Sequence, residues 1–150
     1  MRHKILSKFF TIFLTFSLLT IVFSCSEREQ TVDCFPKTGI SVQLDLKLPA
    51  YQKLQYTGGW IYVNEQGSGT RGLIVVRTSN GFKVYDRNAP HICPGANTTL
   101  EVSEDIKITC KADNSEWILL TGQPTKVAKI APKTYFTNYD SGSQILAIYN

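Results

Sequence analysis

The sequence lacks most of the residues that common enzyme chemistry requires. It has only two histidines, His3 and His91, and His3 lies in the N-terminal segment, which leaves His91 as the candidate general base at neutral pH. No Ser-His-Asp order, phosphate-binding glycine loop or clustered pair of carboxylates stands out. We therefore predict no catalytic residues, and we expect the chain not to be an enzyme.

A net excess of basic residues is also missing from most of the chain. The sequence has 16 Lys and Arg against 12 Asp and Glu, but Arg2, Lys4 and Lys8 all precede the first acidic residue. Without those three, residues 25–150 carry 13 basic against 12 acidic residues, a net charge of +1. No basic patch remains that would favour nucleic acid, so nucleic acid is not expected as a partner.

The first 24 residues lack acidic residues and are typical of an export signal. A basic start is followed by the uncharged run Phe9–Phe23, which is too short to cross a membrane comfortably. The run ends in Ser24 and Cys25, which resembles a bacterial lipobox, in which the cysteine becomes the lipidated first residue of the mature chain. The alternative is an N-terminal anchor helix that is not cleaved.

The lipobox resemblance implies a division of the chain and a location. Residues 1–24 would be the lipoprotein signal peptide, with lipidation at Cys25. Residues 25–37 contain the polar stretch "SEREQTVD" (residues 26–33) and would form a flexible tether, and residues 38–150 would form one domain. We expect a lipid-anchored protein of the bacterial cell envelope, on the periplasmic or surface side of the outer membrane.

Helical periodicity is absent as well, and the sequence consists of short apolar–polar runs separated by turns. Residues 40–48, "ISVQLDLKL", alternate strictly, which is typical of a half-buried antiparallel strand. Asn80-Gly81 is a strong hairpin signal, and a last hairpin is expected to turn at Asp140–Gly142. Short strands at such regular spacing predict an all-β fold, an antiparallel sandwich or partly open barrel.

Cysteine is scarce, and its count is odd once lipidation is considered. If Cys25 carries lipid, Cys34, Cys93 and Cys110 remain. Thiols outside the cytoplasm tend to oxidise, so one disulfide and one leftover thiol are expected.

Residues 110–124 contain the most specific pattern in the chain. The stretch "CKADNSEW", followed by "ILLTGQP", resembles the second box of the Rieske-type iron–sulfur domain, which has the form Cys-x-x-His-Gly-Ser-x-Phe. Cys110 stands at the cysteine of that box and Asp113 at its histidine. The segments "GGWIYV", "RGLIVV" and "YDRN" also look like the small Rieske-like lipoproteins of Bacteroidetes. The resemblance implies a Rieske-like fold.

The first box of the family, Cys-x-His, can be matched in two registers. Matching "APH" keeps His91 but puts Ala89 at the cysteine, and alanine cannot bind iron. Matching "HIC" supplies His91 and Cys93 in swapped order, which together with Cys110 and Asp113 makes four donors. The preceding "DRN" favours the first register.

Three interpretations of these four residues remain open. His91, Cys93, Cys110 and Asp113 could hold a [2Fe–2S] cluster for electron transfer, or a single zinc or iron ion. In the third, which we favour, the fold has lost its cluster and holds no cofactor. A Cys93–Cys110 disulfide would then join the two loops, as a disulfide does in high-potential Rieske domains. We accordingly expect a non-catalytic binding or assembly module that is held to the membrane by lipid and contacts an unknown envelope protein.

Overall fold

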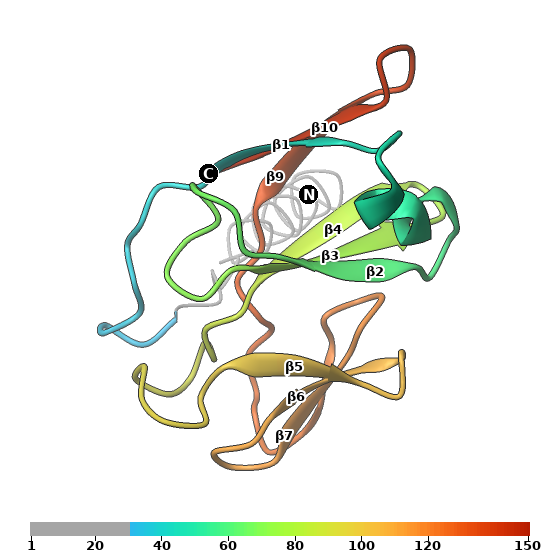
Figure 1. Ribbon diagram of the computed structural model, residues 1–150. Helices are drawn as coiled ribbons and strands as arrows, with labels where there is room; N and C mark the ends of the chain where they lie inside the picture. The colour runs from blue at the N-terminus through green and yellow to red at the C-terminus, as the bar shows by residue number, and fades with distance from the viewer. Residues whose placement is uncertain (1–30) are drawn as a thin grey trace, which may run out of the picture.

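The computed structural model describes residues 31–150, which form antiparallel strands in three stacked sheets (Figure 1). The first sheet has the order β1-β10-β9, the second β2-β3-β4 and the third β5-β6-β7-β8. The strands are β1 (Ser41–Asp45), β2 (Trp60–Val63), β3 (Leu73–Thr78), β4 (Gly81–Asp86), β5 (Leu100–Ser103), β6 (Lys107–Cys110), β7 (Ser115–Ile118), β8 (Pro124–Lys126), β9 (Phe136–Asp140) and β10 (Ile145–Tyr149). The predicted all-β antiparallel fold is confirmed.

The predicted signal peptide, the lipidation site Cys25 and the first part of the tether lie outside the described residues. Within residues 31–150, no helix is long and apolar enough to cross a membrane.

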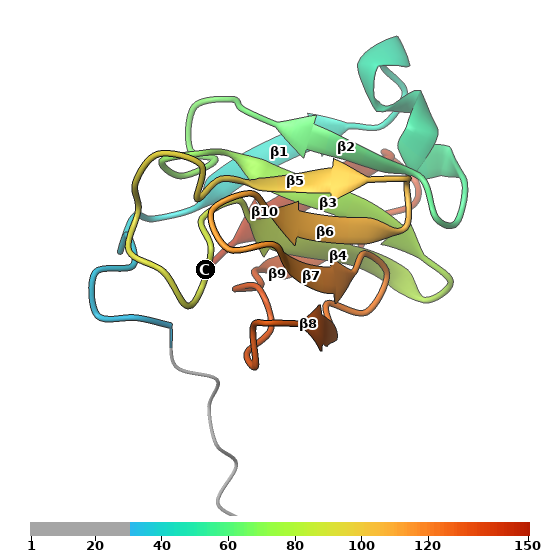
Figure 2. The ribbon, with the colours of Figure 1, turned by 90° about the horizontal axis from the view of Figure 1, so that it is seen from below.

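The β2-β3-β4 sheet is the middle layer and explains the most apolar stretch of the domain. Leu73 and Val75 of β3 pack into one hydrophobic cluster with β1 and β10, while Ile74 and Val76 pack into a second cluster with β5, β6 and β7. Because both faces of β3 are covered, four consecutive residues are fully buried and the strand shows no alternation. Figure 2 shows the β5-β6-β7 layer lying across this middle sheet.

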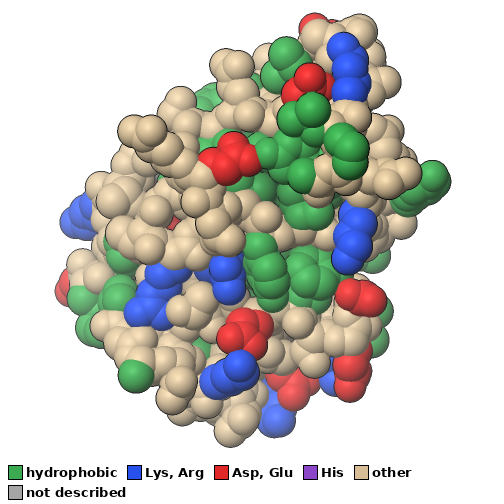
Figure 3. All heavy atoms as spheres, in the orientation of Figure 1, with side chains coloured by type: hydrophobic (Ala, Val, Ile, Leu, Met, Phe, Trp, Pro, Cys, Tyr) green, Lys and Arg blue, Asp and Glu red, His purple; other side chains and the backbone are tan. Residues whose placement is uncertain are grey.

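The outer layers have one buried face each, and their sequences alternate accordingly. In β1, Val42 and Leu44 are buried whereas Ser41 and Gln43 are exposed, as the strict alternation predicted. Across the outer face of the first sheet, Phe136 of β9 stacks on Tyr149 of β10 with 5.9 Å between ring centroids. On the face seen in Figure 3, acidic and basic side chains are interspersed.

Both predicted hairpins are present. The β3–β4 hairpin pairs Thr78 with Gly81, so its turn is formed by Ser79 and Asn80. The β9–β10 hairpin begins its turn at Asp140, whose carboxylate accepts a hydrogen bond from the Gly142 amide at 2.8 Å.

Two local features differ from the sequence prediction. A 3₁₀ helix, η2, covers Pro49–Gln55, where no helix was expected, and it buries Leu54. The first strand ends at Asp45 rather than Leu48, because the Asp45 carboxylate accepts the Lys47 amide at 3.0 Å and turns the chain. Such short local features leave no periodic signal in a sequence.

Two loops meet at one end of the third sheet. The first tip loop (residues 87–99) connects β4 to β5, and the second tip loop (residues 111–114) connects β6 to β7. Cys110 pairs with Leu100 on one side and with Ser115 on the other, so the strand ends that carry the loops are level with one another. This register brings the loop that carries His91 and Cys93 and the loop that carries Asp113 to the same end of the sheet.

Candidate functional site

The structure brings two of the four predicted site residues into direct contact. His91 lies in the first tip loop and Asp113 in the second, and His91 Nε2 is 2.7 Å from Asp113 Oδ2. Both side chains are about one-fifth exposed. The contact therefore joins the two tip loops at the protein surface.

Ser115 completes this contact. Its hydroxyl donates to Asp113 Oδ2 and lies 3.0 Å from His91 Nε2, while its backbone amide donates to Asp113 Oδ1 at 3.0 Å. His91 Nδ1 is buried and has no hydrogen-bond partner among the described residues. In a Ser-His-Asp triad the serine and the aspartate bind opposite ring nitrogens, whereas here both face Nε2. The three residues are thus arranged as a bridge between the loops and not as a nucleophile with its base.

The bridge stabilises the charged form of Asp113. Burial by itself raises the pKa of this carboxyl, but the hydrogen bonds from Ser115 and His91 outweigh burial and lower the pKa from 3.8 to about 2. Asp113 is therefore ionised at neutral pH and accepts from both loops.

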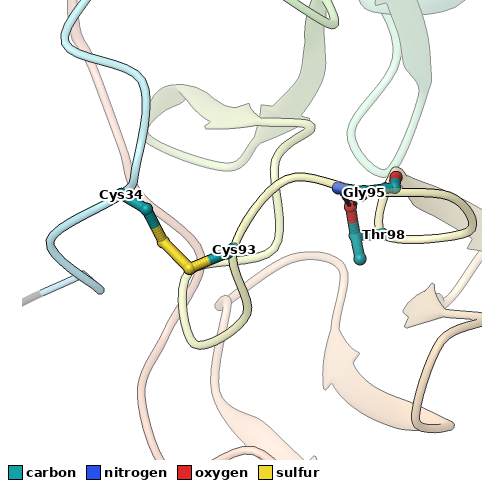
Figure 4. Close-up of a disulfide and its surroundings, with 4 residues drawn as sticks. All are labelled: Cys34, Cys93, Gly95 and Thr98. Carbon is teal, nitrogen blue, oxygen red and sulfur yellow. Dashed lines mark hydrogen bonds between the residues drawn. A yellow bond between two sulfur atoms is a disulfide. The ribbon is translucent and has the colours of Figure 1, made fainter.

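Cys93 forms a disulfide with Cys34, which lies in the N-terminal segment of the described chain (residues 31–38), with 5.5 Å between the two Cα atoms (Figure 4). The expected Cys93–Cys110 disulfide is therefore wrong. Cys93 is exposed and lies beside the N-terminal segment, where the Val32 amide donates to the Pro90 carbonyl at 2.9 Å. The pairing explains Cys34, whose role the sequence left open.

Cys110 is a free thiol with no exposed surface. It packs in the hydrophobic cluster between the second and third sheets, and its Sγ is 3.9 Å from the Asn97 carbonyl oxygen. Burial, the largest effect, raises the pKa of this thiol. Cys110 therefore points into the domain rather than across to Cys93.

This donor set does not fit a [2Fe–2S] cluster, which needs four ligands shared between two irons. Cys93, one of the two expected thiol ligands, is in the disulfide with Cys34. Ala89, which stands at the cysteine of the first box in the other register, is buried and has no side-chain donor. His91 Nε2 faces Asp113. Among residues 31–150, no three His, Cys, Asp or Glu side chains are grouped so that they could hold a metal ion. The described part of the chain therefore also forms no zinc site with four protein ligands.

A buried polar network at the start of the first tip loop was not predicted. Asp86 is almost fully buried and accepts hydrogen bonds from the Tyr135 hydroxyl at 2.6 Å and from the amide and side chain of Asn88 at 2.7 and 2.8 Å. Burial, followed by the bond to Asp86, raises the pKa of Tyr135. These bonds fix the direction in which the chain leaves β4. The "YDRN" motif was recognised in the sequence, but its partner Tyr135 lies 49 residues from Asp86.

The remaining motif residues act in packing. Trp117 is fully buried, and its indole nitrogen donates to the Ile130 carbonyl at 2.8 Å, as expected for a core aromatic. Gly122 has a φ of +74°, and a Cβ atom there would lie 2.9 Å from Cε1 of Tyr85. The turn at Thr121-Gly122, within the "ILLTGQP" stretch, therefore needs glycine for both its backbone conformation and its contact with Tyr85.

No protein-family model matches the sequence, and no curated protein matches it. Among solved structures, the ferredoxin of carbazole 1,9a-dioxygenase from Nocardioides aromaticivorans IC177 matches with a TM-score of 0.42 and 17% identity, covering 74% of this chain and 96% of that one. A complex of reduced oxygenase and oxidized ferredoxin in carbazole 1,9a-dioxygenase matches with a TM-score of 0.43 and 14% identity, covering 76% and 94%.

These matches correct one expectation. We expected the domain to hold no cofactor, and the matches do not bear out that expectation, because by their descriptions both are or contain a ferredoxin.

Proposed function

We propose that the chain is a lipid-anchored protein of the bacterial cell envelope, whose β domain binds an envelope protein through its first tip loop. Residues 93–97 are all exposed, yet they are held from several sides. The disulfide fixes Cys93 to Cys34, and Arg71 donates to the Gly95 carbonyl at 2.8 Å. The proposal rests on a loop that is both exposed and held in one conformation, because a pre-ordered loop loses little conformational entropy when it binds a partner.

The arrangement of the imidazole supports a binding role rather than catalysis. Nε2 of His91 faces Asp113 and Ser115, and Nδ1 is buried, so neither nitrogen is directed to a substrate at the surface.

Photo-crosslinking in cells that produce the full chain tests the binding role. A photoreactive amino acid at Ala96 in the tip should give a discrete crosslinked product, and one at the exposed Ser141 of the β9–β10 turn serves as the matched control. Cys34→Ser, which frees the loop, should weaken the product at Ala96. Equal crosslinking at both positions would contradict a tip-specific partner.

The lipid anchor is tested separately. Wild-type chain should carry acyl groups on Cys25 by mass spectrometry, and Cys25→Ser should remove them. A wild-type chain without acyl groups would contradict the anchor and leave the tip proposal standing.

A second candidate function is single-electron transfer, because both similar solved structures involve ferredoxins. The comparisons favour this candidate, whereas the side-chain contacts favour the first. Cluster binding by this chain would need thiol ligands, and reduction of the Cys34–Cys93 disulfide would supply a second thiol beside Cys110.

Anaerobic purification with and without dithiothreitol distinguishes the two candidates. Two irons per chain with visible absorption and an EPR signal on reduction would establish electron transfer. Cys110→Ser should then abolish iron binding, while Cys34→Ser should not. A colourless protein under both conditions would contradict the electron-transfer candidate.

A further inference from the structure

A pocket of about 670 Å³ is lined in part by residues of the 31–38 segment, and none of its lining residues belongs to either tip loop. Its walls come from residues 31–38 and 131–134 and from Asn150. Residues 131–134 are fixed to strand β4, because the Asp86 amide of that strand donates to the Lys133 carbonyl at 2.8 Å. The other wall is fixed by the disulfide at Cys34.

The lining of this pocket suits an anion. Its lining residues include two basic ones, Lys37 and Lys133, the hydroxyl-bearing Thr31, Thr38 and Thr134, and one acidic side chain, that of Asp33. Within residues 31–150, neither lysine forms an ion pair with a carboxylate. Two unpaired ammonium groups with adjacent hydroxyl donors are the groups that bind phosphate oxygens.

Lys133 is also held in position. Its Nζ lies 5.9 Å from the centroid of the Phe35 ring and 5.7 Å from that of the Tyr135 ring, both within the range of cation–π attraction. The aromatic rings restrict the ammonium without neutralising it, so its charge remains available to a ligand.

The position of the pocket along the chain indicates which anion is close to it. Thr31 lines the pocket and is six residues after Cys25. An extended chain advances at most ~3.6 Å per residue, so a lipid on Cys25 would keep the pocket within about 20 Å of the bilayer. This step rests on the lipid anchor of the proposed function.

We propose that this pocket binds a phosphate-bearing anion, and that in the anchored protein the ligand is the phosphate of a lipid headgroup. Lys37 and Lys133 would bind the phosphate oxygens, with the threonine hydroxyls as further donors. The pocket would thereby hold the domain in one orientation on the membrane.

Residue-resolved lysine acetylation of the full chain tests this proposal. In neutral detergent, inorganic phosphate or glycerol 3-phosphate at about four times its Kd should slow acetylation of Lys37 and Lys133 about fivefold, since protection rises as one plus the ratio of ligand concentration to Kd. Lys129, which is exposed and outside the pocket, should be unaffected and is the internal control. Lys133→Gln should abolish the protection of Lys37, whereas Lys129→Gln should not.

Proteoliposomes distinguish the two sources of phosphate. Vesicles of phosphatidylglycerol should protect both lysines, whereas vesicles of a galactolipid, whose headgroup has no phosphate, should not. Equal protection by both would overturn the headgroup as the ligand, and absence of protection by any phosphate compound would overturn the site. Cys25→Ser in detergent should retain protection by glycerol 3-phosphate, so failure of the anchor and failure of the pocket give different results.

Discussion

The two tip loops lie side by side but are held in different ways. The second is held by near neighbours: the Asn114 amide donates to the Cys110 carbonyl at 2.9 Å, and the Ser115 amide donates to the Asp113 side chain at 3.0 Å. The first is held by distant residues: Cys93 is bonded to Cys34, 59 positions away, and Gly95 accepts from Arg71. The first loop therefore depends on the assembled domain, whereas the second largely determines its own shape.

Loss of the disulfide is expected to lower the stability more than any other change to the two loops. Cys93→Ser should lower the free energy of unfolding by ~4 kcal/mol, because a closed loop of this length restricts the unfolded chain strongly. Urea unfolding measures the loss. Reductant should lower the stability of wild type by a similar amount and leave the variant unchanged. If the variant is as stable as wild type without reductant, the disulfide does not hold the first loop.

Removal of the contact between the loops is the second test. Asp113→Asn should lower the free energy of unfolding by ~1–2 kcal/mol at neutral pH, because it removes a charge-assisted acceptor shared by His91 and Ser115. The exposed carboxylate of Glu104 provides the matched control, Glu104→Gln.

The difference between wild type and Asp113→Asn should depend on pH. The pKa of Asp113 is about 2 in the folded chain and near 3.8 in an unfolded one, so its contribution is present above pH 3.8. That contribution should disappear as the pH falls through 2. Thermal unfolding of both proteins across this range checks the sign, and a difference that stays constant down to pH 2 would contradict it.

Arg71 offers a smaller perturbation that is confined to the first loop. Arg71→Gln removes the hydrogen bonds to Gly95 and Thr99, so amide exchange in residues 95–99 should accelerate about tenfold, which corresponds to ~1.4 kcal/mol of local stability. Exchange at Asn114 and Ser115 should not change. Equal acceleration in both loops would show that they are not independent.

Asn114 is expected to give the smallest effect, confined to the second loop. Its φ is 61°, a conformation that asparagine tolerates and alanine disfavours. Asn114→Ala should cost less than ~1 kcal/mol, whereas Asn114→Gly should be close to neutral. Urea unfolding of the pair measures the difference, and a larger loss with glycine than with alanine would contradict the backbone argument.

The same difference explains which parts of the structure the sequence could predict. The alternation in residues 40–48, the hairpin at Asn80-Gly81 and the second box depend on near neighbours, so their patterns are visible in the chain itself. The η2 helix and the early end of β1 depend on short capping interactions without a period. In the network of Asp86, Asn88 and Tyr135, Tyr135 lies 49 residues from Asp86, so no local sequence pattern could predict their contact.

The cysteines show most clearly what the sequence could not predict. Their number and an oxidising location predict one disulfide and one thiol, which is the outcome within residues 31–150. The choice of partner was wrong, because the family resemblance placed Cys93 against Cys110. Burial of Cys110 between two sheets and exposure of Cys93 beside the N-terminal segment decided the pairing.

The sequence by itself determined the all-β class, most strand positions and the places of the two tip loops, because side-chain alternation and turn chemistry act over a few residues. The tertiary structure decided that His91 faces Asp113, that Cys93 is bonded to Cys34, and that Lys37 and Lys133 share a pocket. Each of these pairs joins segments that are distant in the chain. Their contact is fixed only when the sheets pack and set the directions of the strands that carry them.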